Sequence, residues 1–170
     1  MEEEEDKFNG AYVIDTNIFR PLFNVIYEDV FPEIWESVDE LIELNKFCSV
    51  AEVRKEYDNQ LSHRPESVLW AKDHSHLFLL PSAEDVIMLR KIYEIPEFRM
   101  KPKDIKNKKS HADGFVVAKA HVLNGWAITD ESPTSHDPAK IPNICRHFNV
   151  NCMCLHDFLR ILKNKEYLNE

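Results

Sequence analysis

Four acidic residues of this chain stand next to short apolar segments, in positions that could bring their side chains together. Each one follows a predicted strand, lies on the helix that leaves a strand, or opens the helix before a strand. They are Asp15, Glu56, Asp113 and Glu131. Parallel strands end at the same edge of a sheet, and ligands bind outside that edge. We therefore expect the four carboxylates to meet at one site.

Clustered carboxylates restrict the chemistry of such a site. Four like charges close together are strongly unfavourable unless a cation neutralises them. Oxygen ligands without converging histidine or cysteine are typical of Mg²⁺ or Mn²⁺. Metal ions held in this way activate water and neutralise charge on a phosphate, so the pattern indicates hydrolysis of phosphodiester bonds.

A structural role for Asp15 is the competing interpretation. Asp, Thr and Asn are common in turns and at the first position of helices, and the chain reads Asp15-Thr16-Asn17 after an apolar strand. Taken alone, Asp15 fits capping as well as metal binding, and only the shared position of all four acids favours the metal site. An aspartyl nucleophile of the phosphatase type would need Asp-x-Asp, and residue 17 is Asn.

The elements that position these acids follow from apolar periodicity. Strands are expected at 12–14, 47–50, 126–128 and 150–155, and helices at about 17–27, 32–45, 51–61, 112–123, 143–148 and 156–163. Residues 68–73 are also expected to be helical, 77–80 form an apolar run, and Ser82 is expected to cap a further helix, with Asp85 three residues on. Short apolar strands that alternate with helices predict an α/β fold with a central parallel sheet covered on both faces. The length suits one domain over residues 1–170, with 1–8 as a disordered acidic tip.

Composition excludes several classes of protein. The sequence is 44% hydrophobic and 30% charged, and no apolar run approaches the ~20 residues of a membrane helix. The acidic start lacks the features of a signal peptide, so we expect a cytoplasmic protein with no membrane partner. Three glycines and no Gly-rich motif argue against a nucleotide-binding loop. Cys48, Cys145, Cys152 and Cys154 are expected to be free thiols rather than disulfides or zinc ligands, with Cys152 and Cys154 buried on one face of the last strand.

The charge of −9 is distributed unevenly. Residues 90–109 contain eight basic and three acidic residues. The plain interpretation is a solvated basic loop, but its position before Asp113 makes it a candidate for holding the phosphates of a nucleic acid. The candidate RNA-binding residues are Arg99, Lys101, Lys103, Lys106, Lys108 and Lys109.

Several motifs in chain order resemble the PIN-domain nucleases, and within them an uncharacterised prokaryotic branch related to VapC-type toxins. The matching segments are YVIDTNIF, SVAEVRKE, LWAKDHSHLFLLP, HADGFVVAKAHVLNGWAITDE and KIPNIC. Asp-Thr-Asn alone is weak evidence, whereas the ordered series covers nearly the whole chain.

The resemblance implies a three-layer α/β/α sandwich and Mg²⁺- or Mn²⁺-dependent cleavage of RNA. Carried over by position, the metal ligands and catalytic acids are Asp15, Glu56, Asp113 and Glu131, with Thr16, Asn17, Thr129 and Asp130 as polar support. Glu52 lies one turn before Glu56 on the same helix face and is a rival for the second acid. Glu131 stands where most members of the superfamily have Asp.

The resemblance also suggests partners. A nuclease of this class acts on an RNA substrate, and related toxins pair with an antitoxin protein; a homodimer is also compatible with this class. The alternative function is a PIN-fold module that binds RNA or protein without cutting. The complete set of acids favours the enzyme, because an inactive copy would usually have lost at least one carboxylate.

Overall fold

The central sheet of the computed structural model, which describes residues 7–99, 111–133 and 137–169, has five parallel strands. Their order is β3-β2-β1-β4-β5. The strands are β1 (Tyr12–Ile14), β2 (Phe47–Val50), β3 (Phe78–Leu79), β4 (Trp126–Ile128) and β5 (Asn151–Met153). The chain leaves β1 in the middle of the sheet, builds outward to β2 and β3, and then returns to the other side of β1 for β4 and β5.

Eight α-helices surround the sheet in the described part of the chain. They are α2 (Thr16–Asn24), α3 (Pro32–Glu43), α4 (Ala51–Leu61), α5 (Pro65–Asp73), α6 (Ala83–Glu94), α8 (Ala112–Val122), α9 (Ile141–Phe148) and α10 (Leu155–Asn164). Short 3₁₀ turns lie at Ser75–Leu77, Pro96–Phe98 and Glu166–Asn169.

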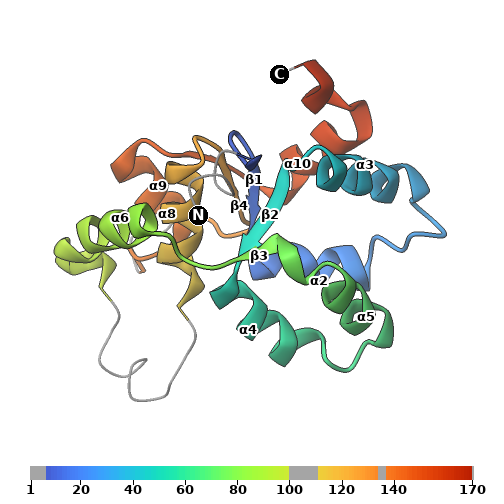
Figure 1. Ribbon diagram of the computed structural model, residues 1–170, viewed down its shortest axis with the longest axis horizontal. Helices are drawn as coiled ribbons and strands as arrows, with labels where there is room; N and C mark the ends of the chain where they lie inside the picture. The colour runs from blue at the N-terminus through green and yellow to red at the C-terminus, as the bar shows by residue number, and fades with distance from the viewer. Residues whose placement is uncertain (1–6, 100–110, 134–136, 170) are drawn as a thin grey trace.

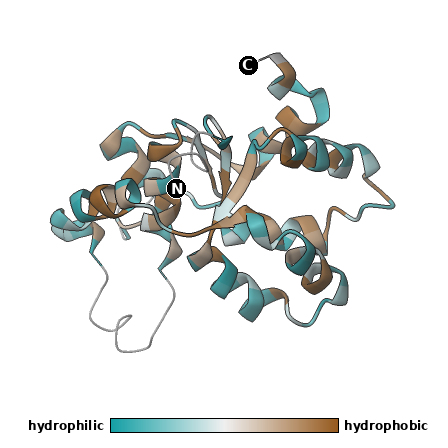
Figure 2. Cartoon of the chain, in the orientation of Figure 1, coloured by the Kyte–Doolittle hydropathy of each residue, from teal (hydrophilic) through white to brown (hydrophobic). Residues whose placement is uncertain are grey.

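The helices form two layers on opposite faces of the sheet. Helix α8 packs on β1, β2 and β4 and is flanked by α6 and α9, while α3 and α10 pack together on the other side (Figure 1). Hydrophobic residues dominate the central strands, and the surrounding helices mix hydrophobic and hydrophilic residues (Figure 2). Strands β1 and β2 are buried along their whole length, as expected for a sheet covered on both faces. The predicted three-layer α/β/α sandwich is therefore confirmed.

Asparagines end three of the helices that lead into strands. Asn45, Asn124 and Asn149 adopt φ values of 55°, 50° and 55°, the left-handed conformation that commonly terminates a helix. Gly125 follows Asn124 for a different reason: a Cβ at this position would lie 2.0 Å from the carbonyl oxygen of Ala11. The Asn124-Gly125 pair thus lets β4 start directly beside β1.

Helix boundaries differ from the sequence predictions in small ways. Helix α2 runs through Pro21 but stops at Asn24, and α5 begins earlier than expected, at Pro65. The last strand is shorter than predicted because Cys154 already caps α10. Phe8 is buried in the core with 4% of its surface exposed, so this residue does not belong to a disordered tip. Residues 1–6 lie outside the described part.

A buried ion pair joins α6 to α8. Lys119 and Asp85 contact each other with side chains that are 2% and 3% exposed. Asp85 also completes a capping box: its carboxylate accepts from the Ser82 backbone N–H at 2.8 Å, and its own N–H donates to the Ser82 hydroxyl at 3.1 Å. The predicted cap at Ser82 is confirmed, while the partner from α8 was not predicted.

None of the helices in the described ranges is both long enough and apolar enough to cross a membrane.

Candidate functional site

Asp15 lies at the carboxyl end of β1 and at the N-terminus of α2. Its Oδ1 accepts a hydrogen bond from the Thr16 N–H at 2.7 Å, so the residue does cap the helix. Its Oδ2 accepts from the Thr129 hydroxyl at 2.9 Å, at the end of β4. The side chain is buried, with 4% of the residue exposed. Capping and a place in the acidic site are therefore both satisfied by the same carboxylate.

Thr129 and Asn17 connect the ends of β1 and β4. The Asn17 amide donates to the Thr129 hydroxyl at 3.1 Å, and its carbonyl oxygen accepts from the Asp130 N–H at 2.9 Å. This network fixes the orientation of Asp15, because the hydroxyl that Asn17 holds is the one that donates to the carboxylate. Asp130 contributes its backbone N–H, while the residue itself is exposed.

Glu56 comes to the same edge from α4. Its Oε2 accepts a hydrogen bond from the Thr16 hydroxyl at 2.7 Å, which ties α4 to the start of α2. Glu52, one turn earlier, is largely buried at 15% side-chain exposure and lies 3.8 Å from Lys55. Both acids face inward, and the bond to Thr16 places Glu56 beside Asp15.

Asp113 occupies the first turn of α8, next to Tyr93 of α6. Gly114 allows this close packing, because a Cβ there would lie 2.7 Å from the Tyr93 hydroxyl oxygen. Burial raises the pKa of Tyr93, and the nearby carboxylates of Asp113 and Glu52 raise it further. Tyr93 therefore forms part of the wall of the site.

Glu131 is held by two donors from one segment. Lys140 donates from its Nζ to Oε1 at 2.5 Å, and the Ile141 N–H donates to Oε2 at 3.1 Å. The Glu131 carboxylate therefore caps the N-terminus of α9, where helix dipole and free N–H groups favour an anion. Its own N–H donates to the Thr129 hydroxyl at 3.2 Å, so Glu131 joins the same network as Asp15.

The acids influence one another electrostatically. Burial raises the pKa of Asp15 to about 7 against the hydrogen bond from Thr129, and the charges of Glu131 and Glu56 add to the increase. Burial likewise raises the pKa of Asp113 to about 8, helped by Glu131, Asp15 and Glu56 and opposed by Lys140. Carboxylates from four elements thus act on the same region, at the carboxyl edge of the sheet.

The donor types fit a hard divalent cation. Burial and, to a smaller extent, the neighbouring carboxylates raise the pKa values of Asp15 and Asp113, and a bound divalent cation would neutralise such a cluster. Within the described ranges, however, no group of three or more His, Cys, Asp or Glu side chains is close enough together to hold a metal ion as placed. Metal binding would require the acidic side chains to move. Among these acids, Glu131 already pairs with a cation, the Lys140 ammonium.

Sequence reasoning missed two residues of this site. Lys140 is nine residues from Glu131. It lies in the KIPNIC segment, and the resemblance of that segment to the PIN-domain nucleases was the signal that could have identified it. Tyr93 carried no signal, because its position depends on how α6 packs against α8.

The basic segment is only partly described. Arg99 is exposed, and its guanidinium donates to the carbonyl oxygens of Tyr93 and Glu94 at the end of α6. Phe98, which also belongs to this segment, is buried against His147 and Phe148. The five predicted RNA-binding lysines, Lys101, Lys103, Lys106, Lys108 and Lys109, lie outside the described residues.

The four cysteines are free. Cys145 of α9 and Cys152 of β5 interact, and the interaction with Cys152 together with burial raises the pKa of the Cys145 thiol. Cys154 is exposed at the start of α10. Cys152 and Cys154 were expected to be buried on a strand face, which is wrong for Cys154, because β5 ends at Met153.

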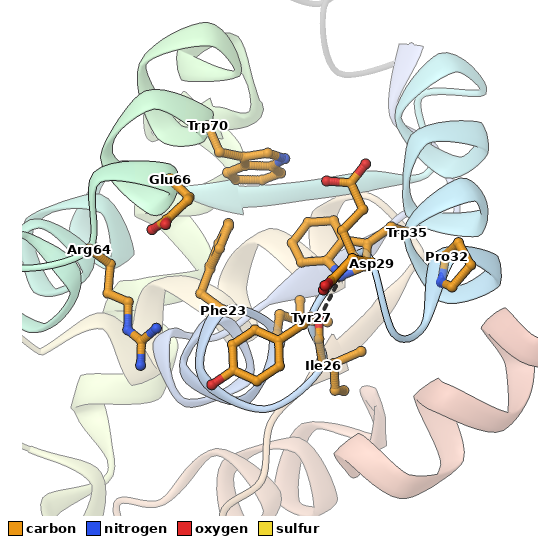
Figure 3. A pocket seen from close by; sticks show the side chains of 11 residues that line it. Phe23, Ile26, Tyr27, Asp29, Pro32, Trp35, Arg64, Glu66 and Trp70 are labelled. Carbon is orange, nitrogen blue, oxygen red and sulfur yellow. Dashed lines mark hydrogen bonds between the residues drawn. The ribbon is translucent and has the colours of Figure 1, made fainter.

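An apolar hollow of about 570 Å³ lies away from the acids, between α2, α3 and α5. Aromatic side chains line it: Phe23 contacts both Trp35 and Trp70, with ring centroids 5.2 Å and 5.6 Å apart (Figure 3). Tyr27 lies at its rim in Figure 3. Its size is that of a ligand or side-chain pocket.

Residues 12–165 match the family described as a domain of unknown function, DUF4411, and the chain belongs to that family. No curated protein matches the chain.

The raised pKa values predict that the metal-free protein loses stability as the pH rises. The pKa values of Asp15 and Asp113 are raised from the ordinary 3.8, so both residues hold protons more tightly in the folded state than in the unfolded state. The free energy of unfolding is therefore highest below about pH 4 and decreases as the pH rises to about 8. We expect Asp113→Asn to raise the free energy of unfolding at pH 8 in EDTA by on the order of 2–4 kcal/mol, and much less at pH 5.

Urea unfolding at both pH values measures this effect. Glu36→Gln, which removes an exposed acid from α3, is the matched control and should show no such pH dependence. An equal gain at pH 5 and pH 8 would contradict the electrostatic explanation.

Proposed function

We propose that this protein is a metal-dependent ribonuclease of the PIN type, which hydrolyses phosphodiester bonds of RNA. The observation that supports the proposal is the arrangement of Asp15, Glu56, Asp113 and Glu131. They come from four different segments of the chain and lie at the edge of the sheet where ligands bind. The charges of neighbouring acids help to raise the pKa values of Asp15 and Asp113, so a bound cation would stabilise the cluster.

The residues divide into ligands and supports in this proposal. The four acids hold Mg²⁺ or Mn²⁺, which supplies Lewis acidity and an activated water for attack on the phosphate. Thr129 and Asn17 orient Asp15, and Thr16 orients Glu56, through the hydrogen bonds given above. These hydrogen bonds hold the side chains of Asp15 and Glu56 in place before the substrate arrives.

The basic residues are assigned to the substrate. Carboxylates repel an RNA backbone, so cations next to the site are needed to hold it. We assign this role to Arg99 and to Lys101, Lys103, Lys106, Lys108 and Lys109. Of these, Arg99 is anchored to the end of α6 by its hydrogen bond to the Tyr93 carbonyl oxygen. The side chain of Tyr93 in turn lies near Asp113.

We further propose a cytoplasmic toxin that an antitoxin protein controls, with a homodimer as its assembly. The apolar hollow supports a protein partner. The segment beside it exposes Val25, Val30 and Phe31 with 61%, 59% and 39% of their surfaces accessible, and such apolar patches mark interaction sites.

A binding module without catalysis is the second candidate, and the state of Glu131 favours it. Both carboxylate oxygens already accept hydrogen bonds, from Lys140 and from the Ile141 N–H. A protein that used this acid only to cap α9 would keep the same arrangement while binding RNA or a protein.

Metal removal separates the two candidates. We expect the purified protein to cut mixed RNAs in Mn²⁺ or Mg²⁺ and to stop cutting in EDTA, because the acids need the cation to approach a phosphate. Cleavage is followed on denaturing gels, and RNA affinity is measured on the same samples. Cutting that persists in EDTA would refute the metal mechanism, and binding without any cutting would establish the binding module.

A further inference from the structure

The Lys140–Glu131 contact occupies the oxygen through which Glu131 could take a metal ion. Its Oε2 accepts from the Ile141 backbone N–H, which the start of α9 keeps in place. Its Oε1 accepts from the Lys140 ammonium at 2.5 Å. The two donors differ in freedom, because a backbone N–H in a helix cannot leave while a lysine side chain can rotate.

A divalent ion on Oε1 would compete with this ammonium. Mg²⁺ lies about 2.0–2.1 Å from its oxygen ligands, so it would stand only about 3–4 Å from a second cation bound to the same oxygen. Like charges so close in a partly buried site repel strongly. The Glu131 side chain is 14% exposed, which leaves little water to screen the repulsion.

Lys140 has the reach to go elsewhere. Its side chain is 35% exposed, and its backbone is fixed as the residue before α9. The carboxylates of Glu131, Asp113 and Asp137 all act on its ammonium group. A lysine on this rim can turn from the acids toward the solvent side, where a phosphate backbone would lie.

We propose that Lys140 is an exchangeable counter-cation: it neutralises Glu131 in the metal-free protein and transfers to a phosphate oxygen of the RNA when the divalent ion takes Glu131. This inference rests on the proposed function, and it adds both a substrate-binding residue and a control on metal binding. Ion-pair exchange would couple metal and RNA, because a bound ion frees the cation that the RNA needs.

The test uses Lys140→Gln, which removes the charge and keeps most of the side chain. We expect its Mn²⁺ dissociation constant to fall about tenfold, because the competing cation is gone, and its kcat/KM at saturating Mn²⁺ to fall about 10–100-fold. Mn²⁺ binding is measured by electron paramagnetic resonance or calorimetry without RNA. Lys140→Arg keeps the charge and should stay within about threefold of the parent in Mn²⁺ affinity.

Lys165→Gln is the matched control. Lys165 forms an equally short pair with Glu40 at 2.5 Å, between α3 and the end of α10; the two lysines are similarly exposed, while Glu40 is more exposed than Glu131. Its loss should change neither measurement. Unchanged Mn²⁺ affinity in Lys140→Gln would overturn the inference even if the parent binds Mn²⁺ and cuts RNA, and so would tighter Mn²⁺ binding with undiminished kcat/KM. A parent that neither binds Mn²⁺ nor cuts would overturn the proposed function and this inference with it.

Discussion

An Asp15→Asn variant is expected to fold like the parent protein and to lose RNA cleavage by about a hundredfold or more. The amide oxygen can accept from the Thr16 N–H, and the amide N–H can donate to the Thr129 hydroxyl oxygen in place of the bond that this hydroxyl donates to the carboxylate, so the cap and the network keep their shape. Only the charge in the metal's coordination sphere is lost. Because burial raises the pKa of Asp15 to about 7, we expect a neutral group at this position not to destabilise the metal-free fold.

Cleavage rates in Mn²⁺, RNA affinity and the unfolding midpoint in EDTA together test this expectation. RNA affinity should be kept or increased, because one charge that repels the phosphates is removed. Glu36→Gln removes an acid from the exposed face of α3 and serves as the control for net charge. A variant that cuts as fast as the parent would remove Asp15 from the metal site and leave it as a helix cap.

The strands were predictable from the sequence because a strand that is buried on both faces appears as a short, uninterrupted run of apolar residues. Runs such as Phe47–Val50 and Trp126–Ile128 are short, apolar and followed by polar or helical residues, and the structure places strands at these limits. Strand β3 lies in the apolar run at 77–80, but it has only two residues and, among the described strands, pairs only with β2. Length, rather than composition, limited the prediction there.

The acids of the candidate site were also predictable, because parallel strand ends share one edge and helix starts follow them. What the sequence could not supply were contacts made across the sheet edge by side chains. Lys140 reaches Glu131 from the start of α9, and Tyr93 reaches Asp113 from α6. Such contacts depend on the packing angles of helices, which local periodicity does not encode.

The ion pair between Lys119 and Asp85 illustrates the same limit, and it should dominate the stability of the α6–α8 contact. Lys119→Met fills a similar volume but leaves the Asp85 carboxylate buried without its counter-ion. We expect the free energy of unfolding to fall by about 3–5 kcal/mol, the usual cost of breaking a buried pair from one side. Urea unfolding followed by circular dichroism measures the change.

The double variant Lys119→Met with Asp85→Asn decides between a charge effect and a packing effect. Asn at position 85 can still accept from the Ser82 N–H, so the cap of α6 remains while both charges disappear. If the loss comes from the unpaired charge, the double variant should recover most of it, since neutral replacements of buried pairs are often tolerated. Lys165→Gln, which breaks an exposed pair, should leave the unfolding midpoint unchanged. A double variant as unstable as Lys119→Met alone would show that the lysine stabilises α6 and α8 by packing rather than by its charge.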